Sequence, residues 1–106
     1  MKNVKVRDIP VFDNPHGLEA RRVYDNPQVQ IVHLDLKPGQ GMKAHAAPMD
    51  VVFYVLEGRG VVERDGESIE VGPDTLIESP ANSLHRLEAA PDSTLRALVI
   101  KTPRPA

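Results

Sequence analysis

Residues 39–58 read GQGMKAHAAPMDVVFYVLEG, and this stretch decides the fold. A glycine stands at each end, His45 lies in the first half, and the second half contains the run VVFYVL. Such a run of β-branched and aromatic residues predicts a β-strand, and because successive positions are apolar, both faces of the strand should be covered. The segment LRALVIK at residues 95–101 has the same character.

Ten prolines and seven glycines separate short apolar runs along the 106 residues, a pattern typical of an all-β sandwich or barrel. No stretch has the periodicity of a helix of three turns. The predicted strands are Val4–Arg7, Glu19–Tyr24, Val29–Leu36, Gly41–His45, Asp50–Leu56, Gly60–Arg64, Glu67–Val71, Thr75–Glu78, Ser83–Glu88 and Thr94–Lys101.

One hairpin can be predicted in register. Asp65-Gly66 suits a two-residue turn because both residues tolerate positive φ. The turn then pairs Arg64 with Glu67, Glu63 with Ser68, Val62 with Ile69 and Val61 with Glu70. Val62, Ile69 and Val71 should share the inner face, with Glu63 and Glu70 pointing outward.

The strand at residues 30–36 alternates, with Val32, Leu34 and Leu36 on one face and His33 on the other. The strands at 50–56 and 94–101 are apolar on both faces instead. A barrel interior covers only one face of each. The other face needs a second sheet, the N-terminal segment or another subunit, and we therefore expect a homodimer.

Two parts of the chain, residues 39–58 and 74–89, match the spacing of the two signatures of the cupin family. The matching residues are Gly39, His45 and Gly58 in the first signature, and Pro80 and His85 in the second. The second signature departs from the family at Asp74, Asn82 and Ala89; Asn82 replaces a glycine, and asparagine tolerates a left-handed turn position. The chain thus resembles a small single-domain cupin over about Gln30 to Lys101.

This resemblance implies an all-β fold, the double-stranded β-helix or cupin jelly-roll barrel. One domain would span residues 1–106, with an N-terminal strand segment at 1–29 and a mobile tail at 102–106. The resemblance also implies a pocket at one mouth of the barrel, where relatives hold a divalent metal.

Carried over residue by residue, the implied metal site is incomplete. His45 and His85 remain, but Ala47 and Val51 stand where two further ligands belong, and neither can coordinate. Catalytic zinc usually keeps three protein ligands, and oxygenase iron keeps two histidines and a carboxylate. Asp50 is the nearest carboxylate, although strand alternation points it the other way. The expected site is therefore a weakly held divalent Fe, Ni, Cu, Zn or Mn ion, or a pocket without metal.

Strand parity predicts the apolar lining of this pocket. The expected lining residues are Val32, Leu34, Met42, Ala47, Val51, Phe53, Ala97 and Val99. An apolar wall with two convergent imidazoles is typical of a small-molecule site, although a plain barrel core has the same composition.

For five other polar residues, the neighbouring sequence predicts whether the side chain lies at the surface or in the barrel. We expect His16, in the loop-like DNPHG, and His33 to be surface or interface histidines. Arg21 and Arg22 should point to opposite faces, so that one of them either enters the barrel or joins Glu19 at the surface. Strand alternation places Lys101 on the inward-facing side of its strand, at the rim of the barrel. There it would either contact an anion or be a solvated strand end.

Composition excludes several classes of protein. There is no cysteine, and hence no disulfide or thiolate site, which fits a reducing cytoplasm. The net charge of −2 is spread along the chain without a basic stripe, so no nucleic-acid partner is expected. The N-terminus lacks the apolar run of a secretion signal, and no segment is apolar enough to span a membrane.

Two functions follow as hypotheses. The first is a binding protein that holds a small, partly apolar molecule in the barrel mouth through His45 and His85. The second is a metal-dependent enzyme, resembling cupin dioxygenases, isomerases or decarboxylases, in which these histidines act with water or Asp50. Without a metal, we expect the pKa values of the two imidazoles to lie near neutrality, so that they can act as acid and base or bind a carboxylate.

Overall fold

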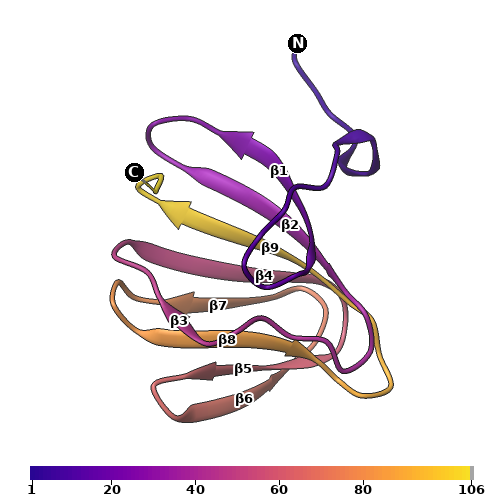
Figure 1. Cartoon of the computed structure of the whole chain (residues 1–106), viewed down its shortest axis with the longest axis vertical. Helices are drawn as coiled ribbons and strands as arrows, with labels where there is room; N and C mark the ends of the chain where they lie inside the picture. The colour runs from indigo at the N-terminus through magenta and orange to yellow at the C-terminus, as the bar shows by residue number, and fades with distance from the viewer. Residues whose placement is uncertain (106) are drawn as a thin grey trace.

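The computed structural model describes residues 1–105 and consists of two antiparallel sheets (Figure 1). Its elements in chain order are the 3-10 helix η1 (Val6–Asp8) and the strands β1 (Glu19–Asp25), β2 (Gln30–Leu36), β3 (His45–Ala46), β4 (Asp50–Gly58), β5 (Gly60–Arg64), β6 (Glu67–Val71), β7 (Thr75–Ser79), β8 (Leu84–Ala89) and β9 (Leu95–Thr102). One sheet has the order β1-β2-β9-β4-β7 and the other β3-β8-β5-β6. This is the predicted jelly roll. No helix within residues 1–105 is long and apolar enough to cross a membrane.

The core lies between the two sheets. In the five-stranded sheet, Val32 of β2 is paired with Val99 of β9, which is paired with Phe53 of β4, so three inward side chains form one row. The facing sheet contributes buried Val62 and Leu87. The predicted alternation of β2 is confirmed, because each apolar inward residue of the strand is buried.

The hairpin of β5 and β6 has the predicted register, from Arg64 with Glu67 to Val61 with Glu70. Asp65 and Gly66 have φ values of 50° and 86°, as the two-residue turn requires. Ile69 pairs with Val62 as predicted, but it is 47% exposed. β6 is the outermost strand of its sheet, and its inner face is only partly covered at Ile69.

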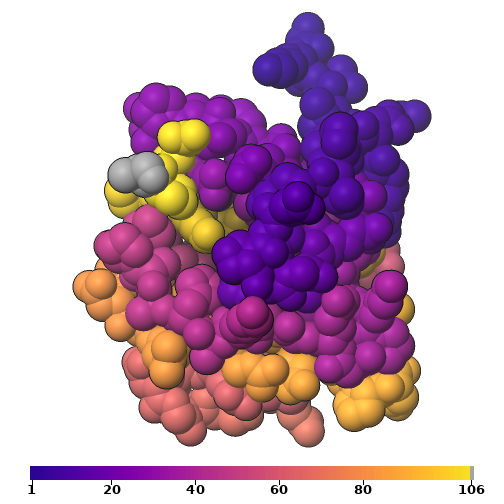
Figure 2. Space-filling model, in the orientation of Figure 1, coloured from indigo at the N-terminus to yellow at the C-terminus, as the bar shows by residue number. Residues whose placement is uncertain are grey.

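The sequence-based boundaries are wrong in two places. Val4–Arg7 is not a strand, and the chain there forms η1, after which Phe12 makes a single bridge to Ala20. Gly41–His45 is also mostly irregular: Gly41 makes one bridge to Glu88, and only His45–Ala46 form β3. Figure 2 shows the indigo N-terminal segment lying across the front of the molecule.

The tail predicted to be mobile is largely in contact with the fold. β9 continues to Thr102, and the Arg104 side chain binds the Asp25 carboxylate, with Nε and Oδ1 2.5 Å apart. Pro105 lines a cavity at the end of the barrel. Ala106 lies outside the described residues.

Candidate functional site

A cavity of about 630 Å³ lies between the sheets and opens at one end of the barrel. Its wall combines apolar strand residues with polar groups near the opening. The lining residues are Phe12, Asn14, Pro15, His16, Leu18, Ala20, Arg22, Asp25, Gln30, Val32, Leu34, Met42, His45, Phe53, His85, Val99, Lys101, Arg104 and Pro105. The volume suits a small organic molecule.

The structure brings His45 and His85 together in this cavity. The two residues are partners in the pairing of β3 with β8, and their ring centroids are 4.7 Å apart. Phe53 contacts the other side of the His85 ring, at 5.2 Å between centroids. Two strands of the smaller sheet thus hold both imidazoles against the apolar wall.

His85 is anchored from behind. Its Nδ1 lies 2.9 Å from Oγ of Ser79, and both side chains are buried, so Nε2 is the ring nitrogen left for a ligand. Burial, followed by the charges of His45 and Lys101, lowers the pKa of His85 to about 4. His85 is therefore a neutral imidazole at pH 7.

His16 is a third imidazole in the cavity, which corrects the expectation of a surface histidine. Its ring lies 4.9 Å from that of His45, and its Nδ1 accepts a hydrogen bond from the backbone N–H of Lys43. The Asn14 side chain shapes this loop by accepting hydrogen bonds from the N–H groups of His16 and Leu18. Burial, then the His45 charge, lowers the pKa of His16. The Asn-Pro-His-Gly turn is a sequence signal for the loop, but not for its position beside β3.

Arg22 and Lys101 bring positive charge to the opening. The Arg22 guanidinium lies 3.9 Å from the centroid of the Phe12 ring, and Lys101 extends from β9. Within residues 1–105, neither has an ion-pair partner, whereas Arg104 is paired with Asp25. Burial, then the Arg22 charge, lowers the pKa of Lys101. Of the two adjacent arginines it is thus Arg22 that lines the cavity.

Most of the predicted apolar lining is in place. Five of the eight residues line the cavity, namely Val32, Leu34, Met42, Phe53 and Val99. Ala47, Val51 and Ala97 are buried in the core but do not line it. Ala47 and Val51, at the positions where the resemblance implied further ligands, therefore belong to the core and not to the cavity wall.

Asp50 lies away from the imidazoles. Its side chain is exposed, and Oδ1 accepts a hydrogen bond from the backbone N–H of Ala81, which corrects its assignment as a ligand. Within residues 1–105, no group of three or more His, Cys, Asp or Glu side chains is arranged to hold a metal ion. The donor set therefore does not fit a three-ligand metal centre.

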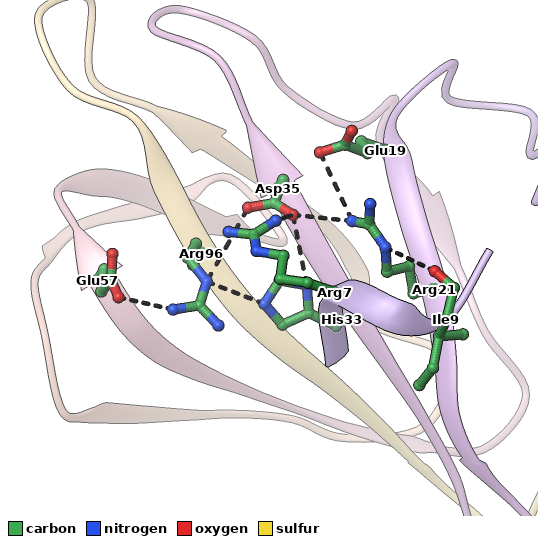
Figure 3. Close-up of polar contacts among 8 residues, drawn as sticks. All are labelled: Arg7, Ile9, Glu19, Arg21, His33, Asp35, Glu57 and Arg96. Atoms are coloured by element: carbon green, nitrogen blue, oxygen red, sulfur yellow. Dashed lines mark hydrogen bonds and ion pairs between the residues drawn. The ribbon is translucent and has the colours of Figure 1, made fainter. Parts of the chain in front are cut away.

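The opposite face of the five-stranded sheet carries a separate polar cluster (Figure 3). His33 faces away from the cavity, as predicted, but it is fully buried rather than at the surface. Its Nε2 accepts a hydrogen bond from Nε of Arg96, and Asp35 binds Arg7 and Arg21 beside it. Nδ1 of His33 has no hydrogen-bond partner within residues 1–105.

Comparisons with known proteins identify the family. A family model described as "Cupin domain" matches residues 32–101. The chain therefore belongs to the cupin family. A comparison with curated proteins found no match.

Solved structures agree with this assignment. TT1209 from Thermus thermophilus has a TM-score of 0.84 and 27% identity, covering 99% of this chain and 100% of that chain. The polyketide cyclase RemF from Streptomyces resistomycificus has a TM-score of 0.85 and 25% identity, covering 100% and 82%. KdgF from Halomonas sp., at 24% identity and a TM-score of 0.75 over 87% and 84%, shows the fold alone.

Proposed function

We propose that this cupin binds a small carboxylate with an apolar body in the cavity between its sheets. The observation that carries the proposal is the pair Arg22 and Lys101, two cations at the opening without an ion-pair partner in residues 1–105. A cation held partly out of water is stabilised by an anion, and the chain as a whole has a net charge of −2. The positive charge of these two side chains at the opening therefore contrasts with the net negative charge of the chain.

The imidazoles supply directional hydrogen bonds beside these charges. The carbonyl oxygen of Lys43 lies 3.3 Å from Nδ1 of His45, so that Nδ1 carries the proton and Nε2 is an acceptor. His16 has the reverse arrangement, because its Nδ1 accepts from a backbone N–H and its neutral ring carries the proton on Nε2. His16 and His45 therefore offer one donor and one acceptor, which suits a ligand with a polar group next to its carboxylate.

Calorimetry with matched compounds tests the proposal. Hydrocinnamate supplies a carboxylate and a phenyl body, and hydrocinnamamide has the same shape without the charge. We expect the acid to bind at least about tenfold more tightly, which corresponds to about 1.4 kcal/mol. Arg22→Gln should remove this preference, whereas Arg59→Gln should retain it, since Arg59 is exposed outside the cavity and paired with Asp92. Equal affinity for acid and amide would overturn the proposal.

The metal-dependent alternative makes a different prediction. It needs a third ligand. Asp50 is held by the backbone N–H of Ala81, and His16, although its ring lies 4.9 Å from that of His45, forms no three-donor group with the two imidazoles within residues 1–105. Hydrocinnamate binding should therefore persist after dialysis against EDTA. Binding that is lost on dialysis and returns with Fe, Ni, Cu, Zn or Mn would favour the metal-dependent function instead.

A second function is acid–base catalysis next to a carbonyl group. It is favoured by the 25% sequence identity to a polyketide cyclase, which extends over the whole chain. His45 and His85 would then move protons, because a neutral imidazole can accept a proton from carbon and return it to another position. Exchange of the methylene protons of benzylacetone with deuterium, followed by NMR, tests this activity. We expect exchange above the buffer rate that falls with His85→Gln; an unchanged rate would remove this candidate.

A further inference from the structure

Lys101 is placed differently from every other lysine of the chain. It lies two residues after Val99 on the inward face of β9 and lines the cavity that also contains the three imidazoles. Lys2, Lys5, Lys37 and Lys43 are all exposed. Within residues 1–105, the Lys101 amine has no hydrogen-bond or ion-pair partner, so its nitrogen is available to a molecule that enters the cavity.

Two surrounding features favour the neutral amine. The apolar wall withdraws the side chain from water, and Arg22 places a second positive charge at the same opening. Both effects lower the pKa of Lys101, burial being the larger. A neutral amine is a nucleophile, and desolvation together with an adjacent cation is a known way to activate a lysine toward carbonyl carbons.

We propose that Nζ of Lys101 forms a reversible imine with the carbonyl carbon of a ligand in this cavity. This inference rests on the proposed carboxylate binding, and it extends the ligand class to 2-oxo acids. Arg22 would hold the carboxylate while the adjacent carbonyl carbon meets Lys101 from β9. A carboxylate next to a carbonyl thus matches the separate functions of Arg22, which binds the anion, and of Lys101, which attacks the carbonyl carbon.

The reaction balances without an oxidant or a reductant. Neutral Nζ attacks the carbonyl carbon, a C–N bond forms, and a proton passes from nitrogen to the carbonyl oxygen, which gives a carbinolamine. Protonation of that hydroxyl lets it leave as water, and loss of the nitrogen proton leaves the imine. His16 and His85 line the same cavity as Lys101, and an imidazole can accept and donate the protons that these steps require.

Reductive trapping tests the inference with the full chain. Phenylpyruvate is the probe, because it is hydrocinnamate with a carbonyl in place of one methylene group. Sodium cyanoborohydride reduces an imine to a stable amine and leaves the free ketone largely unchanged. We expect the mass of the protein to increase by that of the probe less one oxygen atom, with peptide mapping placing the label on Lys101.

Two variants test the position of imine formation. Lys101→Arg cannot form an imine, so it should lose the label, while hydrocinnamate binding is measured on the wild-type protein. Lys43→Arg is the matched control, because Lys43 lies beside the His16 loop but is exposed; its labelling should equal that of wild type. If Lys101→Arg does not fold, the mapped position of the label in wild type decides.

Failure of this inference is distinguishable from failure of the proposed function. Hydrocinnamate binding without any trapped phenylpyruvate would overturn the imine and leave carboxylate binding intact. Label spread over the exposed lysines, or label that persists in Lys101→Arg, would also overturn it. Absence of hydrocinnamate binding would overturn the proposed function itself, and specific label on Lys101 with benzylacetone would then show that the amine acts without a carboxylate.

Discussion

Gly58, at the end of β4, is required by a close approach of two backbone segments. Its φ is +88°, and an added Cβ would lie 1.8 Å from the carbonyl oxygen of Thr94, which belongs to the backbone and cannot move away as a side chain can. We therefore expect Gly58→Ala to lower the free energy of unfolding by about 2–4 kcal/mol, measured by urea denaturation.

Gly66 provides the matched control for this prediction. Its φ of +86° is nearly the same, but nothing lies within 4 Å of an added Cβ. Gly66→Ala should therefore cost only the backbone term of about 1 kcal/mol. Equal losses for the two variants would show that the contact with Thr94 contributes nothing.

Residues whose positions follow from local spacing could be predicted from the sequence. His45, His85 and Gly58 lie where the two signatures place them, and Asn82 has the expected positive φ of 68°. His16 was missed because its place in the cavity depends on a loop that folds back onto Lys43, 27 positions later in the chain. The sequence of the loop contains no pattern from which such a distant contact can be predicted.

The elements of the five-stranded sheet are joined on their outer face by the polar cluster around Asp35 (Figure 3). Asp35 of β2 binds Arg7 of η1 at 2.5 Å and Arg21 of β1 at 3.1 Å. Nε of Arg96 on β9 lies 4.0 Å from Asp35, and Nη1 of Arg96 binds Glu57 of β4 at 2.6 Å. A carboxylate on β2, next to the edge strand β1, thus holds the N-terminal segment through Arg7.

His33 makes this cluster sensitive to acid. Protonation at Nε2 would break its hydrogen bond from Arg96 and add a cation beside Arg7 and Arg21. Burial, then these arginine charges, lowers the pKa of His33 despite the opposing charge of Asp35. Because the folded-state pKa lies below the unfolded value of 6.5, the unfolded chain takes up the proton first, and stability falls as the pH drops below 6.5.

The expected result is a decline in the free energy of unfolding between pH 7 and pH 5, of up to about 1.4 kcal/mol per pH unit for this group. Denaturant titrations at several pH values measure it. His33→Gln should decline less steeply, since glutamine does not titrate and can still accept from Arg96. His16 and His85, whose pKa values are also lowered, account for the slope that remains. Identical slopes for variant and wild type would contradict the role of His33.

Strands could be predicted from the sequence where a segment with the side-chain pattern of a strand also finds a neighbouring strand to pair with. The β5–β6 hairpin has the bounds and register expected from its turn residues. The N-terminal segment was not predictable, because Val4–Arg7 alternates like a strand but has no partner edge, and ion pairing with Asp35 decides its path instead. The predicted strand Gly41–His45 is reduced to the two-residue strand β3, because in this region only His45 and Ala46 pair with β8 as a strand.

At the scale of the molecule, apolar rows cross the outer face of the five-stranded sheet beyond the polar cluster. Ile100 of β9 pairs with Val52 of β4, and Leu98 pairs with Tyr54, which pairs in turn with Leu76 of β7. Leu76 is 61% exposed, and no segment within residues 1–105 buries it. Two adjoining apolar rows of this kind are typical of a surface that contacts another protein.

We predict that a second copy of the chain covers these rows, so that the cupin is a homodimer. Sedimentation equilibrium should give the dimer mass at micromolar concentration. Leu76→Glu should weaken association at least about tenfold, because the interface would bury an unpaired charge or lose its apolar contact. Ile69→Glu is the matched control, since Ile69 is 47% exposed at the edge of the other sheet, and it should leave the dimer unchanged. A wild-type monomer under these conditions, or equal weakening by both variants, would contradict a dimer formed through this face.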